Sequence, residues 1–412
     1  MGGKNMKKMI SVLALAATLV GTNAAHAETL ALTGKFHWLL LASSKDKDQA
    51  IGIARAVSSM ADTVKVITSK SGYFGVIAGP YAYKSIKDIK KADKNSRIGD
   101  LPKDAILTQG ANYIETVWQA PTTATNELIP YSIEKTAEFS SGDFNVKING
   151  QKLEPDRAFT VVEGKDAAGP FHFDIGKDLP KDELASAEEF LGMNYNQAGI
   201  VKLVPGSPSP QVVVTNYSGG AHCCATTTFI SKEKPTAPWS RTTSSELDGE
   251  GYAFEDVNGD GAMELISVDN RFLYSFGSYA GSFAPIEIHQ LIAGKIIDVS
   301  TNQAMRGRLV QDLAGMEYSA NLSPDMWKQN GYLAGWVASK IRLGQGDEAW
   351  ALFMKNYEKE NGFGPQECTS GQKVADCPND NLKAIPIPKA LAGFLRENGY
   401  LPLPAAALKE LN

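Results

Sequence analysis

Length, composition and charge already exclude several classes of protein. The chain has 412 residues, 43% of them hydrophobic, and its 41 basic and 46 acidic side chains give a net charge of −5. A chain of this length forms about two to four domains, each with its own core. The acidic balance argues against a nucleic-acid partner, because proteins that bind nucleic acids present basic surfaces.

The N-terminus has the pattern of a secretory signal peptide. Three lysines precede an apolar run over residues 9–20, and the small residues of a cleavage site follow at 25–27. The run is too short to span a bilayer, and no later segment is long enough. We therefore expect removal of residues 1–27, a mature chain that begins at Glu28 without a membrane span, and a periplasmic or secreted location. An uncleaved anchor is the alternative.

Removal of the leader makes the chain more acidic. The leader contains three lysines and no acidic residue, so the mature chain holds 38 basic and 46 acidic side chains, a net charge of −8.

Residues 28–118 are predicted to form a first module with the order βαββαβ. An apolar run predicts a strand over 36–42, and Asp46 with Gln49 has capping-box spacing at the start of a helix. The remaining elements are expected over 63–68, 73–78, 83–92 (a helix) and 105–108.

Two stretches of this module carry a resemblance to a known family. Residues 38–43 (WLLLAS) and 73–81 (YFGVIAGPY), in the order just given, resemble the SPOR domain. The resemblance implies that peptidoglycan glycan strands bind to one face of the sheet. The residues implied for this contact are Trp38, Leu40, Tyr73, Gly75 and Ile77. The alternative is a SPOR-shaped module that only packs against the rest of the chain, because a fold alone does not establish a function.

A polar stretch rich in Pro and Thr, residues 119–126, is predicted to be a linker. The next region, 127–196, is expected to be small and β-rich. Asn149-Gly150 favours a type I′ turn between two strands, because both central positions of that turn need positive φ. Further elements are expected over 144–148, 151–153, 158–163, 171–175 and, as a helix, 181–191.

The loop at 256–264 has the spacing of a calcium site. Oxygen-bearing side chains recur at alternate positions, and glycines between them permit the sharp curl that brings the oxygens together. The predicted ligands are Asp256, Asn258, Asp260, the Ala262 carbonyl and Glu264. Ser267 stands where an EF-hand requires a bidentate glutamate, and a strand pattern follows in place of a helix. The loop resembles the calcium loops of FG-GAP and VCBS-type repeats, which implies calcium as the cofactor. A metal-free acidic turn is the alternative.

Residues 197–300 are predicted to form a β-rich module with an internal repeat. The segments 201–215 and 255–268 share one form, a loop followed by an apolar strand, at a period near 53 residues. The likeness to FG-GAP repeats favours propeller-like blades, but two blades do not close a ring. Either strands from 127–196 add blades or the module is an open sandwich. Runs over 271–276, 282–288 and 295–299 are expected to add strands.

The four cysteines fall into two pairs along the chain. Thiols tend to pair in an oxidising compartment, and Cys368 with Cys377 closes a short local loop, so a disulfide is predicted there. Cys223 and Cys224 are then either a vicinal disulfide or two buried thiols. A Cys223 nucleophile activated by His222 is a further alternative.

Residues 301–412 are predicted to form a helical region. Ser323-Pro324-Asp325 caps a helix whose apolar residues keep helical spacing to position 341, and a second helix begins at Asp347. A last helix is expected over 389–397. Aromatic residues at this spacing are typical of a packed core.

Together these patterns predict a multidomain α+β protein: a βαββαβ SPOR-like module, a β-rich propeller-like or sandwich module, and a C-terminal helical hairpin region. The chain as a whole resembles uncharacterised exported bacterial proteins. We expect a non-catalytic binding protein of the cell envelope that contacts peptidoglycan glycan and carries one structural calcium site. The alternative is a cell-wall hydrolase, a glycosidase or peptidase, with structural calcium. Its catalytic carboxylates need only meet in space and leave no local motif.

Overall fold

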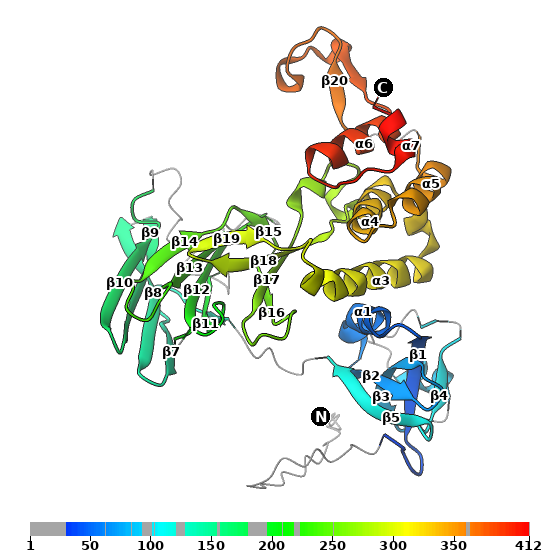
Figure 1. Ribbon diagram of the computed structural model, residues 1–412, viewed down its shortest axis with the longest axis horizontal. Coiled ribbons are helices and arrows are strands. Elements are labelled where there is room, and N and C mark those ends of the chain that lie inside the picture. Colours follow the sequence, from blue (N-terminus) through cyan, green and yellow to red (C-terminus); the bar gives the residue numbers. More distant parts are fainter. Residues whose placement is uncertain are drawn as a thin grey trace, which may run out of the picture.

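The computed structural model of the chain consists of an N-terminal α/β module, three antiparallel sheets and a C-terminal helical region (Figure 1). The structure describes residues 30–61, 63–83, 85–92, 101–102, 104–120, 128–154, 157–179, 196–207, 209–217, 223–249, 251–359 and 363–411. The predicted signal peptide, most of the predicted linker and the helix expected over 181–191 lie outside the described residues.

The N-terminal module is built on a five-stranded antiparallel sheet in the order β4-β1-β3-β2-β5. Its elements are β1 (His37–Ser44), α1 (Lys47–Val57), β2 (Val64–Ser69), β3 (Phe74–Tyr81), α2 (Ile86–Ala92), β4 (Ile106–Thr108) and β5 (Tyr113–Gln119). The predicted βαββαβ order is confirmed, and β5 adds an edge strand beside β2. Asp46 begins α1 as predicted, because its carboxylate accepts the N–H of Gln49 at 3.0 Å.

Three antiparallel sheets follow and pack face to face (Figure 1). The outer sheet contains β7 (Ala137–Ser141), β8 (Phe144–Glu154), β9 (Arg157–Asp166) and β10 (Gly169–Ile175). The middle sheet contains β6 (Ile129–Pro130), β11 (Gln197–Val201), β12 (Gln211–Tyr217), β13 (Cys223–Ser231), β14 (Ser240–Thr243) and β15 (Leu247–Asp248). The inner sheet contains β16 (Ala253–Glu255), β17 (Glu264–Val268), β18 (Ile286–Ile292) and β19 (Lys295–Asp298).

Strand β12 shows why the sheets stack. Every residue from Gln211 to Thr215 is buried, so this part of the strand has no solvent face. Val212 and Val214 pack between the middle and outer sheets, whereas Val213 packs between the middle and inner sheets. Such alternation is expected of a strand that is covered on both faces. None of the sheets closes into a propeller, so the stack is open.

Two of the predicted β features are wrong. Asn149-Gly150 is not a turn, because the ladder with β9 continues through both residues, and neither has positive φ. The chain reverses instead just before β8, where Gly142 has a φ of 58°. The run over 271–276 is not a strand either. Phe272 and Phe276 both turn into the core, while Tyr274 between them has a φ of 61°.

The C-terminal region is helical, as predicted, and packs on the inner sheet. Its helices are α3 (Arg306–Leu322), α4 (Asn330–Arg342), α5 (Gly346–Asn356), α6 (Ile387–Glu397) and α7 (Ala405–Lys409), and a hairpin of β20 (Gln366–Cys368) and β21 (Leu382–Ala384) precedes α6. Trp350 and Phe353 share one core with Ile286 and Ile288 of β18. Among the described residues, no helix is long and apolar enough to cross a membrane.

Candidate functional sites

The sheet face predicted to bind glycan is covered by the chain itself. Trp38 is 5% exposed and Ile77 is 0% exposed, and both lie in a small core with Leu30. The indole N–H of Trp38 donates to the Leu30 carbonyl oxygen at 2.8 Å. Leu40 packs against the same core, and Gly75 is buried. Because they are buried or packed against this core, these residues do not form an exposed flat surface for a sugar ring.

Tyr73 is the predicted contact residue that remains exposed. Its side chain is 40% exposed, and the ammonium group of Lys45 lies 5.5 Å from the centre of its ring. The hydroxyl of Ser69 donates to the Tyr73 carbonyl oxygen at 2.9 Å and accepts the Tyr73 N–H at 3.2 Å. The turn between β2 and β3 therefore presents the ring at one end of the sheet, next to Lys45.

The predicted calcium loop curls as expected, but its carboxylates hold the backbone of the loop. The two oxygens of Asp256 accept the N–H groups of Gly259 at 2.8 Å and Gly261 at 3.0 Å. Oδ1 of Asp260 accepts the N–H of Ala262 at 2.8 Å. Gly259 and Gly261 have φ angles of 77° and 82°, which residues other than glycine rarely adopt. The spacing of Asp and Gly therefore builds the loop that the sequence predicts.

Asn258 and Glu264 close the centre of this loop. Glu264 is 1% exposed, and its oxygens accept the Val257 N–H at 2.7 Å and the Gln290 amide at 2.8 Å. The Asn258 amide group donates to both Asp260 and Glu264 at 3.0 Å. A cation shared by these two carboxylates would take the place of that amide group.

The donor set of this loop, carboxylates with one amide oxygen and one carbonyl, suits calcium. Its oxygens nevertheless have partners within the chain. In the described part of the chain, no group of three or more His, Cys, Asp or Glu side chains is arranged to hold a metal ion. Calcium binding at 256–264 therefore stays a prediction.

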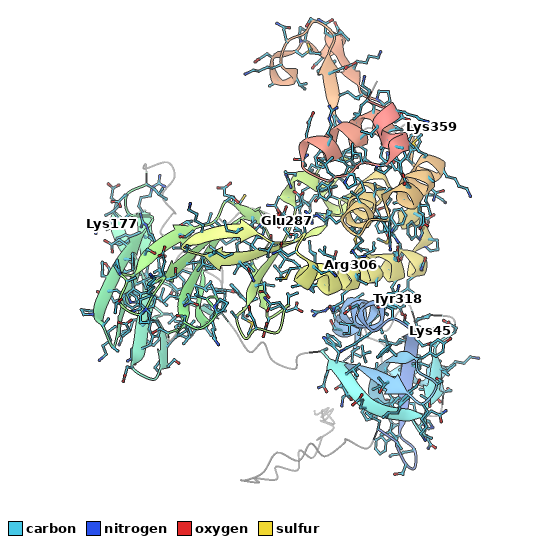
Figure 2. The ribbon with its side chains drawn as sticks, viewed as in Figure 1. Lys45, Lys177, Glu287, Arg306, Tyr318 and Lys359 are labelled. Atoms are coloured by element: carbon cyan, nitrogen blue, oxygen red, sulfur yellow. A yellow bond between two sulfur atoms is a disulfide. The ribbon has the colours of Figure 1, made fainter. Side chains whose placement is uncertain are left out.

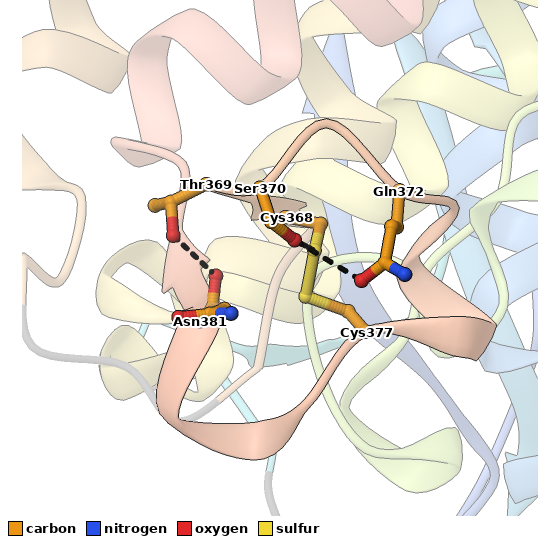
Figure 3. Close-up of a disulfide and its surroundings, with 6 residues drawn as sticks. All are labelled: Cys368, Thr369, Ser370, Gln372, Cys377 and Asn381. Carbon is orange, nitrogen blue, oxygen red and sulfur yellow. Dashed lines mark hydrogen bonds between the residues drawn. A yellow bond between two sulfur atoms is a disulfide. The ribbon is translucent and has the colours of Figure 1, made fainter.

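The predicted disulfide between Cys368 and Cys377 is present. It closes a loop beside the β20–β21 hairpin, where Ser370 donates to Gln372 and Thr369 donates to the Asn381 carbonyl oxygen (Figure 3). Because disulfides persist in oxidising compartments, the bridge suggests a location outside the cytoplasm.

The second pair of cysteines is described only in part. Cys224 is also disulfide-bonded, and the described residues include no free cysteine. A buried free thiol at Cys224 is therefore excluded. His222 and the side chain of Cys223, the pair of the alternative nucleophile, lie outside the described residues.

The sequence patterns did not predict the contact between the N-terminal module and the helical region. Helices α1 and α3 approach so closely that a Cβ atom on Gly52 would lie 2.0 Å from the Gln311 carbonyl oxygen. The Gln311 side chain donates to Asp48 and accepts from Arg55, both at 2.9 Å. Tyr318 of α3 packs against the core of the module (Figure 2). The N-terminal module is thus fastened to the helices.

A cavity of about 250 Å³ lies at this contact, and its charged lining residues are Arg55, Arg308 and Asp312. Glu255, beside the cavity, forms ion pairs with both arginines. Nη1 of Arg308 also lies 3.9 Å from Oδ1 of Asp312. Burial raises the pKa of Asp312 from 3.8 to about 6, although Arg308 and Arg342 act to lower it. The cavity therefore holds a carboxyl group whose pKa is raised above its usual range.

One sequence signal for this contact was available. Gly52 interrupts an otherwise regular helix, and a glycine there lowers helix stability unless close packing requires it. Helix α3 was harder to detect, because it contacts α1 as well as α4 and therefore lacks a single apolar stripe.

The chain is similar in sequence to one described domain family and to two known proteins. Residues 309–399 match the family described as the sll0997 C-terminal domain, which is neither the SPOR nor the FG-GAP family. Over 96% of its length the chain is 34% identical to the uncharacterized protein y4bJ of Sinorhizobium fredii, and it covers 61% of that protein. Over 47% of its length it is 35% identical to the probable thylakoid lumen protein sll0997 of Synechocystis sp., and it covers 58% of that protein. No solved structure matches the chain significantly. The chain is thus homologous to two proteins of which it spans about three fifths.

Proposed function

We propose that this chain is an exported, non-catalytic binding protein of the cell envelope that contacts peptidoglycan glycan through its SPOR-like N-terminal module. The predicted signal peptide and the Cys368–Cys377 disulfide support a compartment outside the cytoplasm. A relative named as a probable thylakoid lumen protein supports the same compartment. The βαββαβ order supports the likeness to SPOR domains.

The observation that carries the proposal is the exposed Tyr73 ring with the Lys45 ammonium group beside it. A tyrosine ring offers a rigid apolar face and a polar edge, which suit the C–H face and the hydroxyl groups of a sugar. The ammonium group has three N–H donors, which can bind the oxygen atoms of a sugar. Because Trp38 and Ile77 are buried, we place the glycan contact at this end of the sheet rather than on its face.

Pelleting with purified sacculi tests the proposal on the mature chain, residues 28–412. The wild type is expected to sediment with the sacculi, and Tyr73→Ala to lower the bound fraction. Phe36→Ala is the matched control. Phe36 is also exposed (44%), and the ammonium group of Lys35 lies 5.9 Å from its ring centre. Phe36 precedes β1, however, so it lies at the end of the sheet opposite to Tyr73. A wild type that stays in the supernatant contradicts the proposal.

A cell-wall hydrolase is the second candidate function, and Asp312 is the observation that favours it. A carboxyl group with a pKa near 6 in a cavity is suited to donate a proton during glycoside cleavage, and Glu255 supplies a second carboxylate across Arg308. Release of soluble fragments from sacculi, lost in Asp312→Asn, would establish this function. Intact sacculi after incubation with the wild type would exclude it.

A further inference from the structure

The loop between β17 and β18, residues 269–285, displays one tyrosine between two buried phenylalanines. Phe272 and Phe276 are each 1% exposed and belong to the core beneath the helices. Tyr274 is 53% exposed and has a φ of 61°. Bulky residues rarely adopt this left-handed conformation, and where they do the surrounding structure must hold them in it. The loop contains two short 3₁₀ helices, Asn270–Phe272 and Tyr279–Gly281, so it is an ordered part of the fold.

The surroundings of Tyr274 hold it firmly. Its N–H donates to the Ser282 hydroxyl at 2.9 Å, and that hydroxyl donates to the Ser278 carbonyl oxygen at 2.9 Å. The far side of the loop rests directly on helix α4, where a Cβ atom on Gly331 would lie 2.1 Å from the Gly281 carbonyl oxygen. The exposed ring is therefore presented by a rigid, tightly packed loop, as binding sites require.

A second tyrosine and a carboxylate lie beside the ring. The rings of Tyr274 and Tyr279 are 5.6 Å apart, centre to centre, with 37° between their planes. The Tyr279 hydroxyl donates to a carboxylate oxygen of Asp248 in β15. Two aromatic rings and an anionic acceptor thus meet where the middle sheet adjoins the loop of the inner sheet.

We infer that Tyr274, with Tyr279 packed against it, forms a second saccharide-binding platform, on which one ring of an envelope glycan stacks while Asp248 accepts a hydroxyl hydrogen. The inference rests on the proposed function for the identity of the glycan. Tyr274 and Tyr279 lie in the loop between β17 and β18, whereas Tyr73 lies in the N-terminal module, so the platform uses residues other than those of the proposed function.

The ring geometry favours a sugar over a cationic ligand. An aromatic cage for a quaternary ammonium group encloses the cation with ring faces turned toward one another. The two tyrosine rings here lie 5.6 Å apart, centre to centre, with 37° between their planes, so they pack against each other and leave no room for a cation between them. The exposed face of the Tyr274 ring matches the flat, apolar face of a sugar ring, much as an aromatic side chain matches a base of a single-stranded nucleic acid.

The test uses the mature chain and an N-acetylglucosamine tetramer, with the dissociation constant measured by calorimetry. Tyr274→Gly is the informative variant, because glycine adopts a φ of 61° without strain and the variant loses only the ring. Its melting temperature should equal or exceed that of the wild type, while the tetramer should bind about tenfold more weakly, as expected when one stacking ring is lost. Tyr274→Phe keeps the ring and should bind within about threefold of the wild type.

The outcomes separate this inference from the proposed function. A wild type that does not bind the tetramer, or a Tyr274→Gly variant that binds it as tightly as the wild type, overturns the platform. Binding of tetramethylammonium in place of the tetramer also overturns it. If the tetramer binds through Tyr274 while the wild type fails to sediment with sacculi, the platform stands and the proposed function fails.

Discussion

Gln211 and Glu264 hold equivalent positions in two repeated units. Gln211 begins β12, and its Oε1 accepts the N–H groups of Leu203 at 2.6 Å and Val204 at 3.0 Å. Glu264 begins β17 in the same way, and its Oε2 accepts the N–H of Val257, seven residues upstream, at 2.7 Å. Gln211 is 0% exposed and Glu264 is 1% exposed. In each unit a buried polar side chain fastens the loop that precedes its strand, so the predicted period of about 53 residues is a repeat of structure.

We expect similar losses of stability when either side chain is removed. Glu264→Ala leaves the partly buried Val257 N–H without this acceptor, and Gln211→Ala does the same to the Leu203 and Val204 N–H groups; the loss of such an acceptor costs about 1–3 kcal/mol. Both variants should lower the free energy of unfolding by about 2 kcal/mol or more in urea titrations with chelator present, whereas Glu264→Gln should lose less. A Glu264→Gln variant as unstable as Glu264→Ala would show that the loop depends on the charge rather than on the hydrogen bonds.

Calcium binding at 256–264 is best tested through Asn258. In Asn258→Asp a carboxylate replaces the amide that donates to Asp260 and Glu264, so the metal-free loop should lose stability through repulsion between like charges. The same change adds a calcium ligand. We expect the variant to melt below the wild type in chelator and to gain more from calcium, titrated from about 0.1 to 10 mM.

Asp260→Ala is the control for this titration, because it removes one ligand and should abolish the gain from calcium. Melting temperatures that ignore calcium in the wild type and in Asn258→Asp alike would identify the loop as an ordinary acidic turn, held by the N–H donors that the structure shows.

Local patterns predicted the N-terminal module well and the sheet stack only in part. Strand alternation, a capped helix and short turns act within a few residues, so the order from β1 to β4 followed from them. The continuous apolar run of β12 indicates a strand buried on both faces. Which sheets cover it depends on residues far along the chain, and no local pattern carries that information.

The candidate sites divide in the same way. The curl of 256–264 was predictable, because Asp and Gly at these spacings bind and turn their own backbone. The covering of Trp38 by the segment at Leu30 was not predictable. The apolar alternation of this strand is the same whether another part of the chain, a sugar or water covers its face. The cavity around Asp312 joins α1 to α3, two helices distant in sequence, and required the tertiary structure.

The contact between α1 and α3 should not tolerate a side chain at Gly52. In Gly52→Ala the new methyl group would overlap the backbone of α3, which has no flexible side chain to move away. Overpacking of this kind costs about 1–3 kcal/mol, and we expect a loss of about that size in urea unfolding. Gly393→Ala in α6 is the control, because its Cβ atom would meet nothing nearer than Leu411 at 4.0 Å. Unchanged stability in Gly52→Ala would show that the two helices separate at no cost.

Asp312 should make stability fall as pH rises. Burial raises its pKa from 3.8 to about 6, so between these values the native state keeps a proton that the unfolded chain releases. The free energy of unfolding therefore decreases as pH rises through this window, and the stabilisation is lost above about pH 6. Its charged neighbours are Arg308 on α3, Arg342 on α4 and Arg55 on α1. The positive charges of these arginines lower the pKa of Asp312, but burial raises it by more.

Asp312→Asn cannot ionise and should remove this pH dependence. At about pH 4 the variant and the wild type should have similar free energies of unfolding, whereas at about pH 7 the variant should be more stable by ~2 kcal/mol. Urea titrations at intervals between these pH values measure the difference directly. Asp325→Asn, at an exposed carboxylate paired with Lys328, controls for the change in net charge and should shift stability little at any pH. A variant less stable than the wild type at neutral pH would show that the ion pairs with the arginines outweigh the burial of Asp312.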